Sequence, residues 1–297
     1  MSQSPTERVA VVTGASSGIG KAAAKALARR GWRVIGLGRD AARCAAAEAE
    51  LRAAAPGAPI AMIRVDLSLL RDAARAADAI AALTDRIDVL INNAGGVASA
   101  QRITDEGNEA TFASNHLGPF VLTHRLLPLL RKAASGKPAG TVRVLATSSS
   151  GHRVCAGMDW HDLQRRHDYN NTAAYTSAKL ANILFTLELA KRLAADGIVA
   201  HAMEPGVVLD SNFVNHAADD VQRYMATQDK VAVSSEAAAE TLVHMAVADE
   251  AGRDSGGYYH QCQRVESSPA AQDSVAAGRL WRESEALAAR VGVNLAA

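Results

Sequence analysis

Short apolar runs alternate with longer alanine-rich stretches along the first two thirds of the chain. Runs rich in Val, Ile and Leu are typical of strands that are buried on both faces. Alanine is the strongest helix former, so the stretches between the runs are predicted to be helices. The predicted strands are Arg8–Val12, Arg33–Leu37, Ile60–Val65, Ile87–Ile91, Val142–Ala146 and Ile198–Met203. The predicted helices are Ile19–Arg30, Asp40–Ala55, Ser68–Leu83, Glu106–Lys132 (with a break allowed near Pro119) and Thr172–Ala195.

Strands that alternate with helices indicate a parallel sheet whose crossovers are helical. We therefore expect an α/β fold, a doubly wound (Rossmann) parallel sheet of about seven strands with helices on both faces. No linker, repeat or low-complexity segment interrupts the pattern, so residues 1–297 are predicted to form one domain.

Composition excludes several classes of protein. The 297 residues include 32 Lys+Arg and 31 Asp+Glu, a balance that argues against a nucleic-acid-binding stripe. Cys44, Cys155 and Cys262 lie far apart without a CxxC pair, so we expect neither a disulfide framework nor a metal site. The polar segment Met1–Arg8 is unlike a signal peptide, and no apolar run reaches the roughly 18 residues of a membrane span. We expect a cytoplasmic protein without membrane contact.

A glycine-rich segment joins the first strand to the first helix. Thr13–Gly20 reads Thr-Gly-x-x-x-Gly-Ile-Gly. In such a segment Gly14 permits the tight turn, Gly18 lets the backbone approach a pyrophosphate, and Gly20 lets the helix pack closely on the strand. The helix N-terminus then offers free N–H groups and a positive dipole end to phosphates. The segment predicts a dinucleotide site.

This glycine pattern resembles that of the short-chain dehydrogenase/reductase family in its single-domain form. The resemblance implies one NAD(P)-binding Rossmann domain, with a substrate lid at about 209–232 and a C-terminal extension at about 255–297. It also implies a homodimer or homotetramer, formed through the two longest predicted helices. The likeness is strongest to retinol-dehydrogenase-like members, in Gly18–Lys21, Asn115–Phe120, Asp162–Gln164, Tyr175–Asn182, Ser255–Tyr259 and Leu280–Trp281.

The end of the second strand bears on the choice of cofactor. Gly38 stands where NAD-type members of the family carry an acid, and Arg39, which can pair with a 2′-phosphate, follows it. The resemblance therefore implies NADP(H). Ser17 stands where NADP-type members often carry a basic residue, which leaves an NAD-preferring alcohol dehydrogenase as an alternative. The residues implied to contact the cofactor are Gly14, Ser16, Ser17, Gly18, Ile19, Gly20, Arg39, Asp66, Leu67, Asn93, Ala94, Gly95, Tyr175, Lys179, Pro205, Gly206 and Val208.

Tyr175 and Lys179 are four residues apart on a predicted helix and share one face of it. A free tyrosine has a pKa of about 10, and a nearby ammonium lowers that pKa toward neutrality. We therefore predict that Tyr175 is the acid/base and that Lys179 lowers its pKa. The resemblance implies that a serine after the fifth strand polarises the substrate carbonyl: Ser149 is favoured, with Ser148 as the alternative.

Asn115, in the long predicted helix, is implied by the resemblance to support a water bridge to Lys179. Together these residues imply NADP(H)-dependent interconversion of a ketone or aldehyde and an alcohol, with small-molecule carbonyl or alcohol substrates. The alternative of another class is a non-catalytic NADP-sensing or scaffold protein on the same fold.

Two segments depart from the family pattern. The family usually has a carboxamide-binding Thr shortly after Val208, where this chain has Leu209, Asp210 and Ser211, so either Ser211 replaces it or Asp210 faces the substrate. The lid, Asn212–Val231, is polar, which favours a substrate more polar than a retinoid.

The few large apolar groups of the lid include Phe213, Tyr224 and Met225. The loop before Tyr175 contains three histidines without metal-ligand spacing, which we expect to be solvated. They are His152, His161 and His167.

Overall fold

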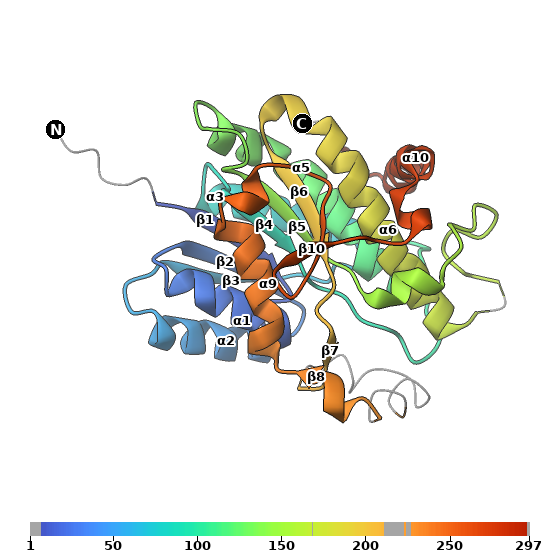
Figure 1. Cartoon of the computed structure of the whole chain (residues 1–297), viewed down its shortest axis with the longest axis horizontal. Helices are drawn as coiled ribbons and strands as arrows, with labels where there is room; N and C mark the ends of the chain where they lie inside the picture. The colour runs from blue at the N-terminus through green and yellow to red at the C-terminus, as the bar shows by residue number, and fades with distance from the viewer. Residues whose placement is uncertain (1–6, 168, 211–222, 224–226, 296–297) are drawn as a thin grey trace.

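The computed structural model describes residues 7–167, 169–210, 223 and 227–295, and it is built around one eight-stranded sheet (Figure 1). The strand order is β10-β9-β6-β5-β4-β1-β2-β3, and every neighbouring pair is parallel except β9 and β10. The predicted doubly wound class is confirmed, with eight strands where we expected about seven. The strands are β1 (Val9–Thr13), β2 (Arg33–Gly38), β3 (Ile60–Arg64), β4 (Val89–Asn92), β5 (Arg143–Thr147), β6 (Val199–Met203), β9 (Tyr258–His260) and β10 (Gln263–Val265).

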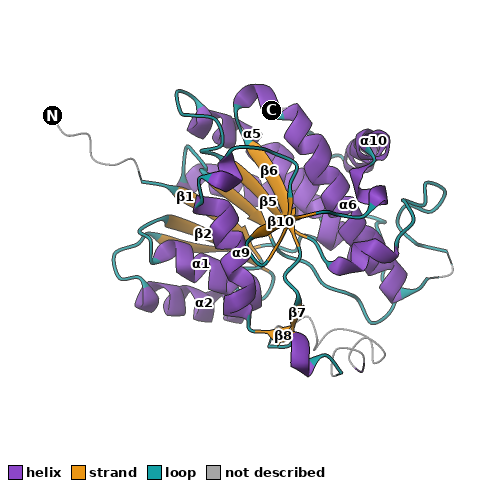
Figure 2. Cartoon of the chain, in the orientation of Figure 1, coloured by secondary structure: helices purple, strands orange, loops and turns teal. Residues whose placement is uncertain are grey.

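Helices cover both faces of the sheet (Figure 2). Alternate residues of β1 belong to different cores: Ala10 packs in one cluster with Leu27 and Leu242, whereas Val9 packs in the other with Leu126. This alternation follows from the two-residue period of a strand. One face carries α1 (Gly18–Ala28), α2 (Ala41–Ala54) and α9 (Ser235–Val247), and the other carries α3 (Leu70–Leu83), α5 (Gly118–Ala134), α6 (Asn171–Arg192) and α10 (Ser274–Arg290). Within the described ranges, no helix is long and apolar enough to cross a membrane.

The long helix predicted over Glu106–Lys132 consists of three parts. It starts at α4 (Ala110–Phe112), continues through a π turn, η1 (Ala113–Leu117), and becomes α5. The break allowed near Pro119 takes the form of this π turn, and the chain stays helical through the proline. The Gly118 N–H bonds the Ala113 carbonyl five residues back, which widens the helix immediately before the proline that lacks an N–H.

The C-terminal part of the chain is packed into the domain. β9 and β10 extend the sheet beside β6, and α10 packs on α6. The Trp281 ring of α10 lies 5.0 Å from the Phe120 ring of α5 and 5.8 Å from Phe185 of α6, with the Arg192 guanidinium 4.2 Å above it. α10 thus covers part of α6, one of the two helices through which we expected two copies of the chain to associate. The oligomeric state stays a prediction.

The remaining short elements connect these layers. β7 (Val207–Val208) and β8 (Ala232–Val233) form a separate parallel pair. The 3₁₀ turns are η2 (Ser150–Val154), η3 (Ala194–Asp196), η4 (Asp229–Val231), η5 (Glu250–Gly252) and η6 (Pro269–Gln272). The predicted lid lies largely outside the described residues, as do Ser211, Phe213, Tyr224 and Met225.

Candidate active site

Thr13 joins the carboxyl ends of β1 and β4. Its hydroxyl donates to the Ile91 carbonyl at 3.3 Å and accepts the N–H groups of Asn93 and Ala94, both at 2.9 Å. The Asn93 side-chain amide returns a bond to the Thr13 carbonyl at 3.1 Å. The predicted cofactor residues Asn93 and Ala94 are therefore held beside the glycine-rich segment. Ligands of doubly wound sheets bind at the carboxyl ends of the strands.

The glycine-rich segment needs its glycines for two physical reasons. Gly14 and Gly18 have φ of +71° and +52°, which side chains other than glycine rarely adopt. At Gly20 a Cβ would lie 2.4 Å from the Gly14 carbonyl oxygen and 2.5 Å from the Asn93 side-chain nitrogen. The helix can approach the strand this closely only because Gly20 has no side chain.

The N-terminus of α1 is available to an anion. Ser17 caps the helix without a side-chain hydrogen bond, and the first turn carries no acidic residue. Free N–H groups and a positive dipole end therefore remain at this position. Ile19 follows as a partly buried residue that packs against the core beneath α1.

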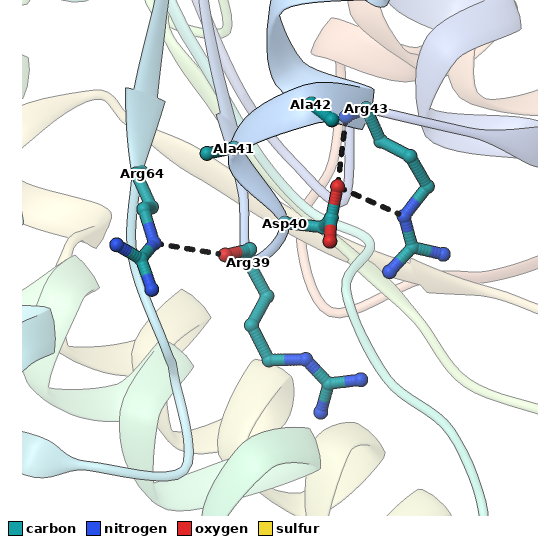
Figure 3. A pocket seen from close by; sticks show the side chains of 6 residues that line it. All are labelled: Arg39, Asp40, Ala41, Ala42, Arg43 and Arg64. Atoms are coloured by element: carbon teal, nitrogen blue, oxygen red, sulfur yellow. Dashed lines mark hydrogen bonds and ion pairs between the residues drawn. The ribbon is translucent and has the colours of Figure 1, made fainter.

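A basic hollow of about 560 Å³ lies at the ends of β2 and β3, lined by Arg39, Arg43 and Arg64 with Asp40, Ala41 and Ala42 (Figure 3). The Arg43 guanidinium already has an ionic partner, because the Asp40 carboxylate lies 3.8 Å from it. The same carboxylate accepts the Arg43 backbone N–H at 2.8 Å. That backbone bond is the main reason why the pKa of Asp40 is lowered. Among the described residues, the Arg39 guanidinium has no hydrogen bond or ion pair, and Figure 3 shows it extending away from Asp40.

Arg64 is a basic residue that our sequence reasoning missed. Its Nε donates to the Arg39 carbonyl at 3.3 Å, so its side chain lies beside Arg39. The signal was present in the pattern, because parallel pairing of the second and third strands places Arg64 opposite Gly38. At Gly38 a Cβ would lie 2.6 Å from the Cys44 sulfur and 2.9 Å from the Ser16 hydroxyl. This crowding leaves no room for an acidic side chain at that position without rearrangement.

The remaining predicted cofactor residues differ in what they expose. Asp66 accepts both the N–H and the hydroxyl of Ser68, at 2.9 and 2.7 Å, and is partly exposed. The Leu67 side chain belongs to the core, so only its backbone can face a ligand. Pro205 and Gly206 follow β6, and Val208 lies in β7.

Tyr175, Ser149 and Lys179 come together where β5 meets α6. Tyr175 and Lys179 occupy one face of α6, with the Lys179 ammonium 5.5 Å from the centre of the Tyr175 ring. The ammonium donates to the Thr147 carbonyl at 3.1 Å. The Ser149 side chain is hydrogen-bonded to Tyr175. The Ser148 hydroxyl instead donates to the backbone carbonyl of Lys179 at 2.8 Å and is buried. The geometry therefore favours Ser149 over Ser148 as the group that faces the site.

Burial shifts both titrating groups toward their neutral forms. It raises the pKa of Tyr175 to about 12, although the Ser149 hydrogen bond acts in the opposite direction. It lowers the pKa of Lys179 to about 8. The net shift of the Tyr175 pKa is upward because desolvation of the phenol dominates, while the Lys179 ammonium donates to the Thr147 carbonyl. The expectation that Lys179 lowers this pKa stays a prediction. Tyr175 is thus held protonated, as a proton donor requires.

Asn115 lies in the π turn and is 1% exposed. Its amide nitrogen donates to the Gly96 and Thr111 carbonyls, both at 2.8 Å, and its amide oxygen accepts the Gly96 N–H at 3.2 Å. A Cβ at Gly95 would lie 2.4 Å from that oxygen and 3.0 Å from the Lys179 ammonium. Asn115, Gly95 and Lys179 are therefore adjacent, and the side chain of Asn115 is occupied in holding the segment that follows β4.

Asp210 does not face the site. Its carboxylate accepts the backbone N–H of Ser235 at 3.1 Å and the Ser235 hydroxyl at 2.7 Å, at the start of α9. An acid at a helix N-terminus is stabilised by the free N–H groups and the dipole. The alternative in which Asp210 contacts the substrate is therefore wrong. Ser211, the residue of the other alternative, lies outside the described residues.

Replacing Asp210 by alanine should lower the free energy of unfolding by about 1 kcal/mol, the usual effect of removing such a cap. Urea unfolding monitored by circular dichroism measures this change. If Asp210 contacted the substrate instead, the variant would keep its stability and change the Michaelis constant for a substrate that carries an amine.

His152 is fully buried, so the prediction that it is solvated is wrong, whereas His161 and His167 are exposed as expected. Within the described part of the chain, no cluster of His, Cys, Asp and Glu could hold a metal ion.

A sequence model described as short chain dehydrogenase matches residues 8–156, which contain the glycine-rich segment, Asn115 and Ser149. The chain belongs to the short-chain dehydrogenase family. Mouse retinol dehydrogenase 12 is 38% identical over 278 residues, which are 93% of this chain and 85% of the relative. Human retinol dehydrogenase 13 is 35% identical over 286 residues, covering 94% and 84%.

A solved structure, the Pseudomonas aeruginosa RhlG/NADP active-site complex, is 30% identical, with a TM-score of 0.68 and coverage of 84% of this chain and 93% of that one. The predicted family membership is confirmed. This short-chain dehydrogenase is an oxidoreductase similar to the retinol dehydrogenases.

Proposed function

We propose that this short-chain dehydrogenase uses NADPH to reduce a ketone or aldehyde to an alcohol. The observation that carries the proposal is the contact of Ser149 with Tyr175, one helical turn from the buried Lys179. All three lie at the carboxyl ends of the parallel strands, on the side where the glycine-rich segment leaves the N-terminus of α1 free. Keeping the Lys179 ammonium buried costs free energy, because the charge must be desolvated, and this cost supports a task for the group.

The residues present fit a dinucleotide phosphate. Gly14, Gly18 and Gly20 shape the segment beside the free N-terminus of α1, where the backbone N–H groups would hold the pyrophosphate. When bound, the nicotinamide supplies a hydride. Arg39 and Arg64 stand at the hollow beyond the second strand, where a 2′-phosphate would be held.

Each residue of the cluster would then have one task in reduction. The Ser149 hydroxyl donates a hydrogen bond to the substrate carbonyl oxygen and orients it toward Tyr175. Tyr175 donates its proton to that oxygen as negative charge develops there. Lys179 supplies the positive charge that stabilises the phenolate left behind.

Preference for NADP is supported by three observations. The Arg39 guanidinium has no partner among the described residues, Arg64 lies beside it, and Gly38 has no room for the acid that would bind ribose hydroxyls. The RhlG structure is titled as a complex with NADP. An NAD-preferring alcohol dehydrogenase is the alternative, and Ser17 remains the residue that favours it.

The test is a panel of carbonyl and alcohol substrates assayed with NADPH, NADH and their oxidised forms. We expect reduction with NADPH to be fastest, and a small polar carbonyl to be reduced faster than retinal. A protein that binds NADPH and turns over none of the panel would support the non-catalytic alternative.

Arg39→Ala is expected to lower the ratio of kcat/KM for NADPH over NADH by about 10- to 100-fold, because each charge-assisted phosphate contact contributes about 1.5–3 kcal/mol. Arg64→Ala should lower the ratio in the same direction. The matched control is Arg30→Ala, since Arg30 is an exposed arginine whose guanidinium donates to the Ala26 carbonyl of its own helix. An unchanged ratio in both Arg39→Ala and Arg64→Ala would refute the assignment of the hollow.

A further inference from the structure

The backbone of Ser149 is held by a buried histidine. The Ser149 carbonyl accepts the His152 ring nitrogen Nδ1 at 2.7 Å and the His152 backbone N–H at 3.1 Å. The Ser149 hydroxyl accepts the Gly151 N–H at 3.1 Å and faces Tyr175. The position of that hydroxyl therefore depends on the turn η2, which the His152 ring stabilises through its bond to the Ser149 carbonyl.

The surroundings of His152 determine which ring nitrogen carries the proton. The Ser268 backbone N–H donates to Nε2 at 3.0 Å, so Nε2 is the acceptor. In the neutral ring the proton is then on Nδ1, where it is donated to the Ser149 carbonyl. The ring is fully buried, and burial lowers the pKa of His152, which keeps it neutral.

Tyr258 of β9 completes the pocket around this ring. Its ring packs edge-on against His152 with centroids 5.1 Å apart, and its hydroxyl oxygen lies 3.5 Å from Nδ1. Because the Nδ1 proton is directed at Ser149, the Tyr258 hydroxyl is free to donate toward the neighbouring Glu204 carboxylate. Burial and Glu204 both raise the pKa of Tyr258, so it stays protonated.

We propose that His152 is a positioning residue for Ser149, with its ring fixed by Ser268 and Tyr258 from the C-terminal extension. The proposal rests on the proposed function, since it assigns Ser149 a task in carbonyl reduction. It also extends the catalytic apparatus beyond residues 8–156, because Tyr258 and Ser268 lie in the part of the chain that follows them. His152 touches neither substrate nor cofactor in this scheme and acts only through Ser149.

The test compares two amides at position 152. The side-chain nitrogen of Asn is as many bonds from the backbone as His Nδ1, so His152→Asn can still donate to the Ser149 carbonyl. His152→Gln places its amide where Nε2 was and loses that bond. We expect His152→Gln to lower kcat about 10- to 100-fold, as a displacement of about 1 Å does at a reacting centre. His152→Asn should stay within about threefold of the original chain, and the Kd for NADPH, measured by fluorescence, should change less than about twofold in both.

His201 is the matched control, because it is equally buried and also bonds one backbone N–H and one carbonyl, those of Gly257 and Ala251. His201→Asn and His201→Gln should reduce stability without separating in kcat. Equal kcat in the Asn and Gln variants of His152 would overturn the proposal.

Crystal structures of the two His152 variants give a readout that does not depend on activity. We expect the Ser149 hydroxyl to move away from Tyr175 in the Gln variant and to stay in place in the Asn variant. An unmoved hydroxyl in the Gln variant would overturn the positioning role. Absence of carbonyl reduction by the unmodified chain would instead count against the proposed function, while the structures would still decide what His152 does.

Discussion

Tyr175→Phe is expected to reduce kcat/KM for carbonyl reduction about 10³-fold, within the range that general acid catalysis contributes. In the proposed reduction the Tyr175 hydroxyl transfers its proton to the substrate oxygen, whereas Ser149 only donates a hydrogen bond and Lys179 only supplies charge. Its pKa, raised by burial to about 12, keeps it protonated over the whole pH range in which the protein is expected to work. Phenylalanine preserves the ring beside the Lys179 ammonium, so the packing of α6 should be unchanged.

The measurement is steady-state kinetics with NADPH, combined with cofactor binding followed by fluorescence. Tyr259→Phe is the control, because Tyr259 is the middle residue of β9 and packs in the core on the other face of the sheet. Only Tyr175→Phe should lose activity, and both variants should bind NADPH normally. Retention of full activity by Tyr175→Phe would exclude the acid assigned here and with it the proposed mechanism.

The fold was predictable as far as local patterns determine it. The alternation of apolar runs and alanine-rich stretches led to the strands of the parallel sheet from β1 to β6 and to the helices between them. The strands β9 and β10 are too short to carry a periodic signal, since each has three residues. The π turn before Pro119 was not predictable either, because its five residues are too few to show a change of period.

The site was predictable where one motif places its residues together, as in the glycine-rich segment and the Tyr175–Lys179 pair. It was not predictable where distant segments meet. His152 is buried by Tyr258 and Ser268, which are more than one hundred residues away along the chain. Asp210 accepts hydrogen bonds from Ser235 at the start of α9. The local sequence around an aspartate does not tell whether it is solvated, faces a substrate or bonds a helix N-terminus. Only the packed structure distinguishes these cases.

Lys179→Met is expected to stabilise the protein at neutral pH while lowering kcat/KM by at least about 10²-fold. The Lys179 side chain is 3% exposed, and burial lowers the pKa of the ammonium from 10.5 to about 8. A depression of that size means that keeping the charge buried costs about 3 kcal/mol at pH 7. Methionine removes this cost, and the Thr147 carbonyl keeps a second donor, the Asn182 amide at 3.2 Å. We expect a net gain of about 1–3 kcal/mol, since the contact of the ammonium with the Tyr175 ring is also lost.

The pH dependence of this gain follows from the direction of the shift. Below pH 8 the ammonium is charged in both the folded and the unfolded chain, so its burial destabilises the original protein fully. Between pH 8 and 10.5 the folded chain releases the proton first, and the free energy of unfolding of the original protein rises with pH. The stability difference from Lys179→Met should therefore be largest near pH 7 and shrink toward pH 10, as measured by urea unfolding across that range. Lys191→Met, an exposed lysine of the same helix, should change stability by less than about 0.5 kcal/mol at every pH. A loss of stability in Lys179→Met at pH 7 would show that the ammonium is compensated in the fold, and would contradict the burial cost from which the prediction is drawn.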